Sequence, residues 1–274
     1  MQPAPKPHGD PNFMTSLARG LDVIRGFSRE RRYMSISQLS HKTGIPRAAV
    51  RRCLYTLRQL GYVECADGRN YSLRPKLLGL GHAYLSSTPL VVSAQPFLDQ
   101  VSEAAAESCS LATLEGEDIL YVARSITSRI ISVTLNVGSR LPAYCMSTGR
   151  VLLAALDDDA LERWLAELRP ERYTEKTIVS KRKLREAILQ ARRDGWTVMD
   201  EEYEIGFRSL SVPIRDRSDR TIAALNVCCP SPRVTLKTMK TEFLPVTLRA
   251  AQEIRESLPD GVVRSGRDFL PPRS

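Results

Sequence analysis

The segment that decides the fold of the first third of the chain is residues 45–63, IPRAAVRRCLYTLRQLGYV. Its apolar residues recur with the i, i+4, i+7 spacing of one helical face, at Val50, Leu54 and Leu57. Pro46 suits the first position of a helix, and Gly61 is typical of a helix end. The segment therefore predicts a helix from about Pro46 to Gly61 with one side buried in a core.

The opposite side of this predicted helix carries arginine. At about 100° per residue, Arg47, Arg51 and Arg58 fall within roughly 40° of one another and more than roughly 90° from the apolar face. Arginine suits guanine O6 and N7 in the major groove of DNA, and other Arg and Lys side chains bind phosphates without reading sequence. The helix is therefore expected to have a core side and a nucleic-acid side.

Two shorter helices are predicted upstream. Ser35 and Gln38 have the spacing of a capping box and Gly44 suits a helix end, which predicts a helix at about residues 37–43. An earlier helix is predicted within residues 13–27 from one apolar face made of Leu17, Leu21 and Ile24. A short helix, a turn containing glycine and a helix with base-reaching residues near its start form the helix-turn-helix pattern.

A small β-hairpin is predicted directly after these helices. Residues 62–66 and 70–73 have strand character and flank an Asp67-Gly68 turn. Such a hairpin would be a wing with Arg69 at its tip, available to a phosphate or the minor groove. Residues 13–74 therefore predict a winged helix-turn-helix domain; the alternative is a basic three-helix bundle that binds another protein.

The net charge of +9 is segregated along the chain. Residues 1–88 hold 14 Lys and Arg against 5 Asp and Glu, whereas residues 89–274 hold 26 of each. Residues 31–63 hold seven basic residues and no acidic one. Such a balance is expected of a chain with one segment that meets a polyanion and another that does not.

Composition excludes several other classes of protein. No run reaches the roughly 18 apolar residues of a membrane span, and residues 1–12 lack the apolar segment of a signal peptide, so we expect a cytoplasmic protein without a membrane partner. The six cysteines show no C-x-x-C spacing and no nearby histidine, so no metal and no cofactor is expected. The Pro-rich ends, residues 1–12 and 259–274, are predicted to be flexible tails.

The rest of the chain predicts a linker and a second domain. Residues 75–88 predict a linker helix, and residues 89–258 mix helical and strand patterns. Helices are predicted at 97–107, 148–156, 160–168, 184–194 and 236–258, the last with a kink near Pro245. Strands are predicted at 110–114, 119–123, 131–135, 197–200, 210–214 and 222–227. Hairpin turns at 115–118 and 217–220 make the domain α+β with a largely antiparallel sheet.

Catalytic motifs are weak in this second domain. It holds no histidine. Ser180 and Lys183 have the S-x-x-K spacing of serine acylases, which also use a Lys-Thr-Gly motif. Here the Lys-Thr-Gly triplet lies upstream, at residues 42–44, so the order of the two motifs is reversed. The loop at 138–147 instead leads to a helix start near Thr148, whose free N–H groups suit a carboxylate. An acidic aromatic ligand would also need a cation, and the sequence does not rank the four candidates Arg124, Arg129, Arg150 and Arg208.

Several runs of the chain resemble one family. SLARGLDVIRGF, IPRAAVRRCLYTLRQLGYV and YSLRPKLLGLGHAYL in the first part, and LPAYCMSTGRVLLA, GWTVMDEEYEIGFRSLSVPI and AALNVCCP in the second, resemble the IclR family of bacterial transcriptional regulators over about residues 13–258. The PRAAVRRCL and HAYLSSTPL segments resemble in particular the regulators of protocatechuate, 4-hydroxybenzoate and β-ketoadipate catabolism. The resemblance implies an N-terminal winged helix-turn-helix, a linker helix and a C-terminal α+β sensor domain similar to GAF and PAS domains.

These patterns together predict two sets of site residues. We expect DNA to be contacted by Ser35, Arg47, Ala48, Arg51, Arg52, Tyr55, Arg58 and Arg69. The resemblance implies an effector site made of Ser147, Thr148, Asp200, Ser209, Asn226 and Cys228.

The function expected from the sequence is ligand-responsive regulation rather than catalysis. A homodimer or tetramer would bind pseudo-palindromic operator DNA and respond to a small aromatic acid or a β-ketoadipate-like effector. Two alternatives stay open: a hydrolase acting on an amide or ester in the second domain, and a constitutive architectural DNA-binding protein.

Overall fold

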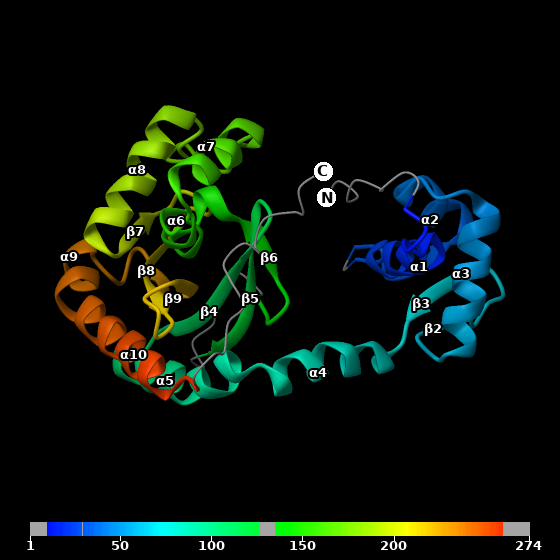
Figure 1. Ribbon diagram of the computed structural model, residues 1–274, viewed down its shortest axis with the longest axis horizontal. Coiled ribbons are helices and arrows are strands. Elements are labelled where there is room, and N and C mark those ends of the chain that lie inside the picture. The colour runs from blue at the N-terminus through cyan, green and yellow to red at the C-terminus, as the bar shows by residue number, and fades with distance from the viewer. Residues whose placement is uncertain (1–9, 29, 127–134, 260–274) are drawn as a thin grey trace. The chain divides into compact units, whose positions relative to one another are not determined.

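The computed structural model describes residues 10–28, 30–126 and 135–259 of the chain. The chain divides into two compact units, the first ending at Tyr84 and the second beginning at Leu85 (Figure 1). The predicted flexible tails lie almost wholly outside the described residues.

The first unit contains three helices and a small antiparallel sheet. The helices are α1 (Thr15–Arg25), α2 (Ile36–Thr43) and α3 (Arg47–Gln59), and the strands are β1 (Met34–Ser35), β2 (Val63–Glu64) and β3 (Asn70–Leu73). The strands are ordered β1-β3-β2, so β2 and β3 form the predicted hairpin. The predicted core side of α3 is confirmed, because Val50, Leu54 and Leu57 are all buried.

Local chemistry sets the ends of α2 and α3 much as predicted. The Ser35 hydroxyl accepts from the Gln38 N–H at 3.3 Å, while the Gln38 side chain accepts from the Ser35 N–H at 2.9 Å. Gly44 ends α2 in the left-handed conformation with φ 67°. Pro46 is the N-cap of α3 and not its first helical residue as predicted, so α3 begins one residue later, at Arg47.

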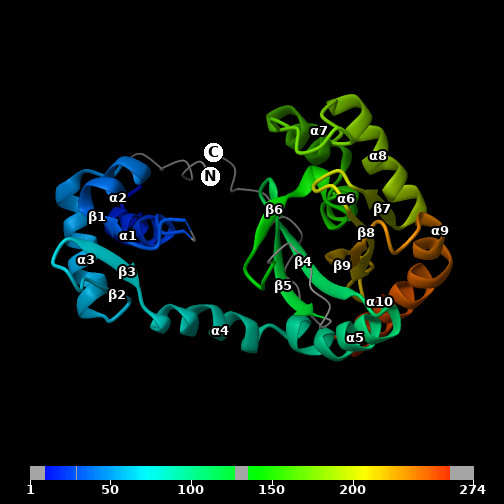
Figure 2. The same ribbon diagram turned by 180° about the vertical axis from the view of Figure 1, so that it is seen from behind.

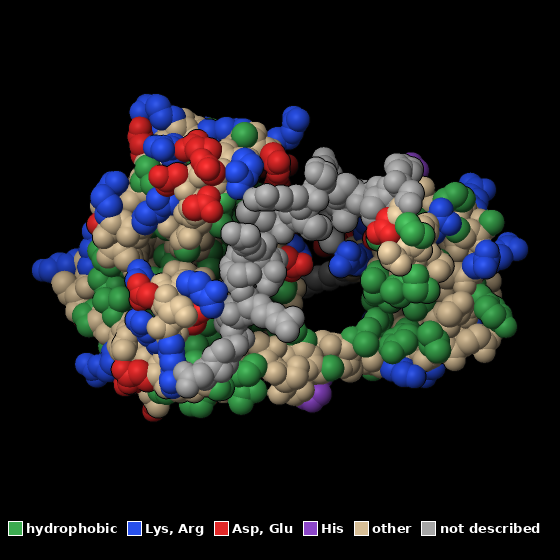
Figure 3. Space-filling view, in the orientation of Figure 1, with side chains coloured by type: hydrophobic (Ala, Val, Ile, Leu, Met, Phe, Trp, Pro, Cys, Tyr) green, Lys and Arg blue, Asp and Glu red, His purple; other side chains and the backbone are tan. Residues whose placement is uncertain are grey.

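The predicted apolar face of α1 is a core face at only one of its three residues. Leu17 and Leu21 are 59% and 45% exposed, whereas Ile24 is half-buried against the core, and Val23, which was not predicted, is fully buried. The physical reason is that the packing partners of α1, chiefly α3, contact its other side. Hydrophobic side chains gather on the surface over α1 (Figure 3).

Helical residues follow the hairpin. Residues Pro75–Leu77 form a 3₁₀ turn, and α4 (Leu78–Ser87) continues from it. No side chain of α4 is buried, and Leu78 and Leu80 are 75% and 55% exposed.

The second unit is built on one antiparallel sheet with the strand order β6-β5-β4-β9-β8-β7. The strands are β4 (Ser108–Glu115), β5 (Asp118–Ser125), β6 (Arg140–Pro142), β7 (Thr197–Asp200), β8 (Phe207–Arg215) and β9 (Thr221–Pro230). The hairpins predicted at 115–118 and 217–220 are confirmed, since they join β4 to β5 and β8 to β9. The predicted strand at 131–135 lies almost entirely outside the described residues, and β6 was not predicted.

Helices cover both faces of this sheet (Figures 1 and 2). One face packs against α5 (Pro89–Ala105) and α10 (Leu244–Ser257). The other packs against α6 (Ser147–Ala154), α7 (Asp158–Glu167) and α8 (Lys181–Asp194). The fold class predicted from the sequence, a winged helix-turn-helix followed by a helical segment and an antiparallel α+β domain, is confirmed.

The kink predicted near Pro245 takes the form of a widened helical turn. The single predicted helix is divided into α9 (Leu236–Thr238), a π-helical turn at Met239–Phe243, and α10. Proline has no N–H to donate to the preceding turn, so the backbone there is free to widen. The Thr247 hydroxyl donates to the Phe243 carbonyl at 2.7 Å, which adds a side-chain hydrogen bond to the first turn of α10.

Candidate functional site

The outer side of α3 presents its basic residues to solvent. Among the residues expected to contact DNA, seven are exposed: Arg47, Ala48, Arg51, Arg52, Tyr55, Arg58 and Arg69. The basic residues within 31–63 form no ion pair with any carboxylate in the described part of the chain. Ser35 differs from this set because it is half-buried and its hydroxyl caps α2. The surface of α3 therefore offers positive charge that no nearby carboxylate neutralises.

The tip of the hairpin is ordered by one carboxylate. Asp67 accepts from the backbone N–H groups of Asn70 at 2.6 Å and Arg69 at 2.9 Å. These hydrogen bonds lower the pKa of Asp67 to about 2. The turn that carries Arg69 is therefore shaped by an ionised side chain at neutral pH.

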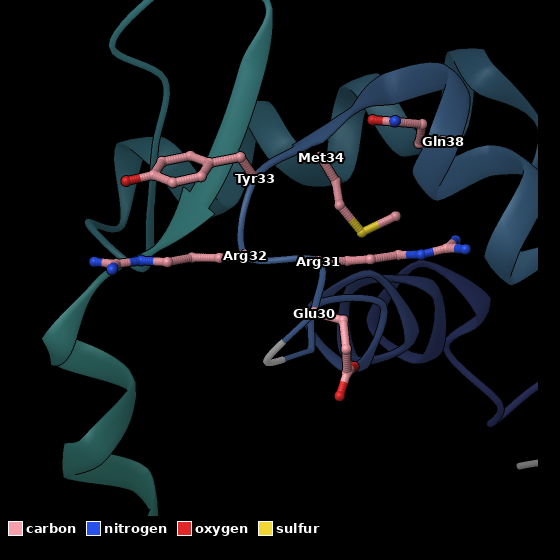
Figure 4. A pocket seen from close by; sticks show the side chains of 6 residues that line it. All are labelled: Glu30, Arg31, Arg32, Tyr33, Met34 and Gln38. Atoms are coloured by element: carbon pink, nitrogen blue, oxygen red, sulfur yellow. The ribbon is translucent and has the colours of Figure 1, made fainter.

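A separate surface hollow of the first unit lies between α1 and α2. In Figure 4 the side chains of Arg31 and Arg32 extend in opposite directions, and that of Tyr33 lies on the same side as Arg32. The Arg32 guanidinium is 5.6 Å from the centre of the Tyr33 ring. The hollow shares no residue with the exposed side of α3.

Most of the predicted effector residues meet on the face of the second sheet that α6 covers. The Ser147 hydroxyl, at the start of α6, lies 2.7 Å from the hydroxyls of both Ser209 and Ser211. Residues directly opposite one another in an antiparallel pair share a face. Ser209 is opposite Cys228, and Ser211 is opposite Asn226, so both belong to this face.

The close approach of α6 to the preceding turn depends on one glycine. A Cβ atom on Gly149 would lie 1.9 Å from the Ala143 carbonyl oxygen, which no side chain could tolerate. Ser147 and Thr148 are fully buried at this contact. The sequence CMSTG therefore fixes α6 against the sheet through the residue that lacks a side chain.

Several buried polar atoms on this face have no hydrogen-bond partner among the described residues. They include the Ser108 hydroxyl, the Thr148 hydroxyl oxygen and the Asn226 side-chain oxygen, whose residues are 1%, 0% and 2% exposed. An unsatisfied buried polar group costs about 1–3 kcal/mol, so such atoms call for an explanation. A ligand that hydrogen-bonds to them would remove that cost.

A narrow cavity of about 40 Å³ opens beside these residues. Its polar lining comes from Arg124, Glu202, Tyr203, Glu204, Arg208, Ser209 and Cys228. Its apolar lining includes Leu141, Met146, Met199 and Phe207. The combination of apolar walls with a few convergent polar groups is typical of a small-molecule site.

The predicted residue Asp200 is not brought together with the others. Its carboxylate pairs with Lys176 at 2.8 Å and with Arg208. Partial burial would raise the pKa of Asp200, but the hydrogen bonds from Lys176 and Arg208 hold it below its usual range. The reason is the two-residue period of β7: the buried side chain of Met199 lines the cavity, and that of its neighbour Asp200 does not.

The four candidate cations differ in their partners. The Arg150 guanidinium binds both carboxylate oxygens of Glu202, at 2.7 and 2.5 Å, and both side chains are buried. Arg208 is paired with Asp200, and Arg129 lies outside the described residues. Arg124 and Arg208 both line the cavity, and of these two only Arg124 has no carboxylate partner among the described residues.

Sequence reasoning missed three serines of this face. Ser108 is opposite Cys228 and so extends the row that contains Ser209, whereas Ser110 is opposite Asn226 and extends the row that contains Ser211. The alternation of small polar and apolar residues in SCSL, 108–111, was a usable signal. Burial raises the pKa of the Cys228 thiol to about 12 in spite of nearby Arg124, so this cysteine is a neutral thiol in the site.

Two family models match the chain. The IclR helix-turn-helix domain matches residues 16–65, and the bacterial transcriptional regulator IclR C-terminal domain matches residues 82–256. The chain belongs to the IclR family. This family consists of transcriptional regulators rather than enzymes. The Ser180-x-x-Lys183 spacing that suggested a hydrolase is explained by helix capping, since the Ser180 side chain accepts from the Lys183 N–H at the start of α8.

Similar proteins share nearly the whole length of the chain. The Pca regulon regulatory protein of Pseudomonas putida is 54% identical over 91% of this chain and 86% of its own length. The p-hydroxybenzoate hydroxylase transcriptional activator of Acinetobacter baylyi is 31% identical over 89% of this chain and 92% of its own. An IclR homolog from Microbacterium hydrocarbonoxydans, solved in complex with 4-hydroxybenzoate, is 25% identical with a TM-score of 0.76 over 89% of this chain and 99% of its own.

The described residues contain neither a membrane-spanning helix nor a cluster of metal ligands. None of the described helices is both long and apolar enough to cross a membrane. Within the same residues, no group of three or more His, Cys, Asp or Glu side chains is arranged to hold a metal ion.

Proposed function

We propose that this IclR-family protein binds operator DNA and regulates genes of aromatic-acid catabolism, in the pathway of protocatechuate, 4-hydroxybenzoate and β-ketoadipate. The observation that carries the proposal is 54% identity with the Pca regulon regulatory protein along nearly the whole chain. The 4-hydroxybenzoate complex of a second relative supports a carboxylic acid as the effector.

DNA binding rests on the first unit. The exposed arginines Arg47, Arg51 and Arg58 of α3 suit base edges and phosphates in a major groove, and Arg69 at the tip of the wing suits a phosphate or the minor groove. Arg52, Tyr55 and Ala48 extend the same exposed surface. Because bacterial operators lie in the cytoplasm, the protein is proposed to act there.

The exposed face of α1 supports assembly of two copies. Met14, Leu17 and Leu21 are 65%, 59% and 45% exposed and lie on one side of α1 or at its start. Clustered exposed apolar side chains are typical of a protein–protein contact. A two-fold homodimer, or a tetramer made of two of them, would present two α3 helices to pseudo-palindromic half-sites.

The small size of the cavity in the second unit suggests how a ligand could control DNA binding. A cavity of about 40 Å³ has room for little more than a water molecule, so an aromatic acid requires a wider arrangement of its walls. A ligand that binds only the wide arrangement has the difference in affinity that regulation requires. The helical segment 75–88 joins the two units and is proposed to carry this change to the DNA-binding domains.

The test is fluorescence anisotropy of the labelled intergenic DNA beside the gene, titrated with full-length protein at fixed salt. Protocatechuate, 4-hydroxybenzoate and β-ketoadipate are each added in turn. We expect nanomolar binding that one of the acids shifts, or a footprint that it changes at equal affinity. Tight binding without any effect of the three acids would favour the architectural alternative, and turnover of an added ester or amide would favour the hydrolase.

A further inference from the structure

The candidate cations of the second unit are not equally available to a ligand. The charge of Arg150 is matched by the buried carboxylate of Glu202, which accepts from both terminal guanidinium nitrogens, although the Arg150 Nε atom has no partner among the described residues. Arg208 is bound to Asp200 and donates to the carbonyls of Ser231 at 3.0 Å and Val234 at 2.8 Å. Both guanidinium groups therefore already have partners that hold them in the fold.

Arg124 is in a different state. It donates to the Leu135 carbonyl but forms no ion pair with any carboxylate in the described residues. Its Nε atom is buried and has no hydrogen-bond partner within residues 10–28, 30–126 and 135–259. A buried guanidinium N–H without an acceptor is costly, and hydrogen bonds from Arg to carboxylates are among the strongest in proteins.

The sheet register places Arg124 at the end of the polar row. Arg124 is opposite Ser110, which is opposite Asn226, which is opposite Ser211. These residues share the face that α6 covers, because Ser211 contacts Ser147 of α6. The charge of Arg124 reaches this face, since it acts to lower the pKa of the Cys228 thiol that burial raises.

We propose that Arg124 binds the carboxylate of the effector, through Nε and the neighbouring guanidinium nitrogen that Leu135 does not occupy. This assignment rests on the proposed function and deepens it by naming the residue that recognises the acid. The rest of the ligand extends across β4 and β9 toward the unpartnered oxygens of Asn226 and Thr148, a distance of about 10 Å for two strand spacings.

The chemistry that Arg124 recognises is the carboxylate, which an aromatic acid and an open-chain keto acid share. A hydroxyl on the ring, or a polar group at the far end of an open chain, would meet the Asn226 and Thr148 oxygens. Ligands that lack the carboxylate should lose most of their affinity, whereas the identity of the remainder decides which acid is preferred.

The experiment is isothermal titration calorimetry of the full-length protein with 4-hydroxybenzoate, protocatechuate, β-ketoadipate and the neutral amide 4-hydroxybenzamide. The variants are Arg124→Gln, Arg124→Lys and the control Arg185→Gln, which removes an exposed arginine that pairs with Glu162 on the surface. Operator affinity without ligand and tryptophan fluorescence report whether each variant is folded. We expect the best acid to bind Arg124→Gln about 30-fold or more weakly, because a buried charged partner is lost.

The amide separates charge recognition from general damage. Its affinity should change less than about threefold in Arg124→Gln, and Arg185→Gln should bind every compound as the wild type does. If Arg124→Gln does not fold, Arg124→Lys tests the assignment instead. Lysine keeps the positive charge but cannot form the bidentate hydrogen bonds of a guanidinium, so we expect the acid to bind about tenfold more weakly and the amide to bind as in the wild type.

The outcomes separate this assignment from the proposed function. If the wild type binds one acid and Arg124→Gln binds it within threefold, the assignment of Arg124 is wrong and the regulator proposal stands. Equal loss of the acid and the amide in a folded variant would also overturn the assignment. If the wild type binds none of the three acids, the proposed effector class and the assignment are overturned together.

Discussion

Replacing Arg150 by methionine removes one partner of the buried ion pair that joins α6 to the segment after β7. The two side chains are 5% and 10% exposed, and the guanidinium contacts both carboxylate oxygens of Glu202. The only other donor to that carboxylate in the described residues is the Ile178 N–H, at 3.4 Å. In Arg150→Met, a buried carboxylate is left almost without compensation.

The expected cost follows from that geometry. Breaking a buried pair by removing one partner typically destabilises a protein by about 3–5 kcal/mol, because the remaining charge stays buried. Replacing both partners by apolar residues of similar size is often close to neutral. We therefore expect Arg150→Met to lower the free energy of unfolding of the second unit by about 3–5 kcal/mol, and Arg150→Met/Glu202→Leu to recover most of that loss.

The measurement is urea unfolding followed by tryptophan fluorescence. Both tryptophans, Trp164 and Trp196, lie in the second unit, so the signal reports that unit and not the first. Arg182→Met is the control, because Arg182 and Glu186 form an exposed pair on α8 whose loss should cost less than about 0.5 kcal/mol. A loss below about 1 kcal/mol in Arg150→Met, or a double variant as unstable as the sum of the singles, would refute this account of the pair.

Three further predictions concern the two sites. Arg51→Ala should weaken operator binding by about 1–3 kcal/mol and blur discrimination between operator variants, measured by anisotropy; unchanged affinity would remove Arg51 from the DNA surface. Thr148→Val should stabilise the ligand-free second unit by about 1 kcal/mol in urea while weakening effector binding, and a destabilised variant would show that the buried hydroxyl already has a partner. Since hydrogen bonds from Asn70 and Arg69 lower the pKa of Asp67 to about 2, against about 3.9 in an unfolded chain, the wing should keep their stabilisation above about pH 4 and lose it as the pH falls toward 2. NMR amide shifts of Asn70 and Arg69 that stay constant over that range would contradict it.

The parts of the fold that were predicted well are those that local chemistry determines. The Ser35 and Gln38 capping box, the left-handed Gly44 and the Asp67-Gly68 turn each depend on neighbours within a few residues. Such short-range geometry is legible in sequence because the side chain and the backbone group it satisfies are close along the chain. The face of α1 was predicted less well for the opposite reason: an apolar stripe indicates burial, but which of its residues the core covers depends on how α1 packs against α3.

The site depends on pairings that sequence does not specify. Ser110 and Asn226 are 116 positions apart and become neighbours only because β4 pairs with β9 in one register. A shift of one residue would turn either side chain to the opposite face of the sheet. Sequence could place small polar residues on strands, but the row that they form with Arg124 required the register, and the partners of each arginine required the packed structure.

In both units of the chain, an arginine without a carboxylate partner lies where we propose that a ligand binds. In the second unit the acidic and basic residues are equal in number, and arginines such as Arg150 and Arg208 are matched by carboxylates of the fold. The first unit holds the whole net excess of positive charge, and the arginines of α3 have no carboxylate partner among the described residues. Because unpaired charge lowers the stability of a folded unit, it persists where a ligand supplies the counter-charge. On α3 that ligand would be a polyanion in high-dielectric solvent. At Arg124 it would be a single carboxylate in a narrow, largely apolar cavity, where each hydrogen bond is stronger because the local dielectric is low.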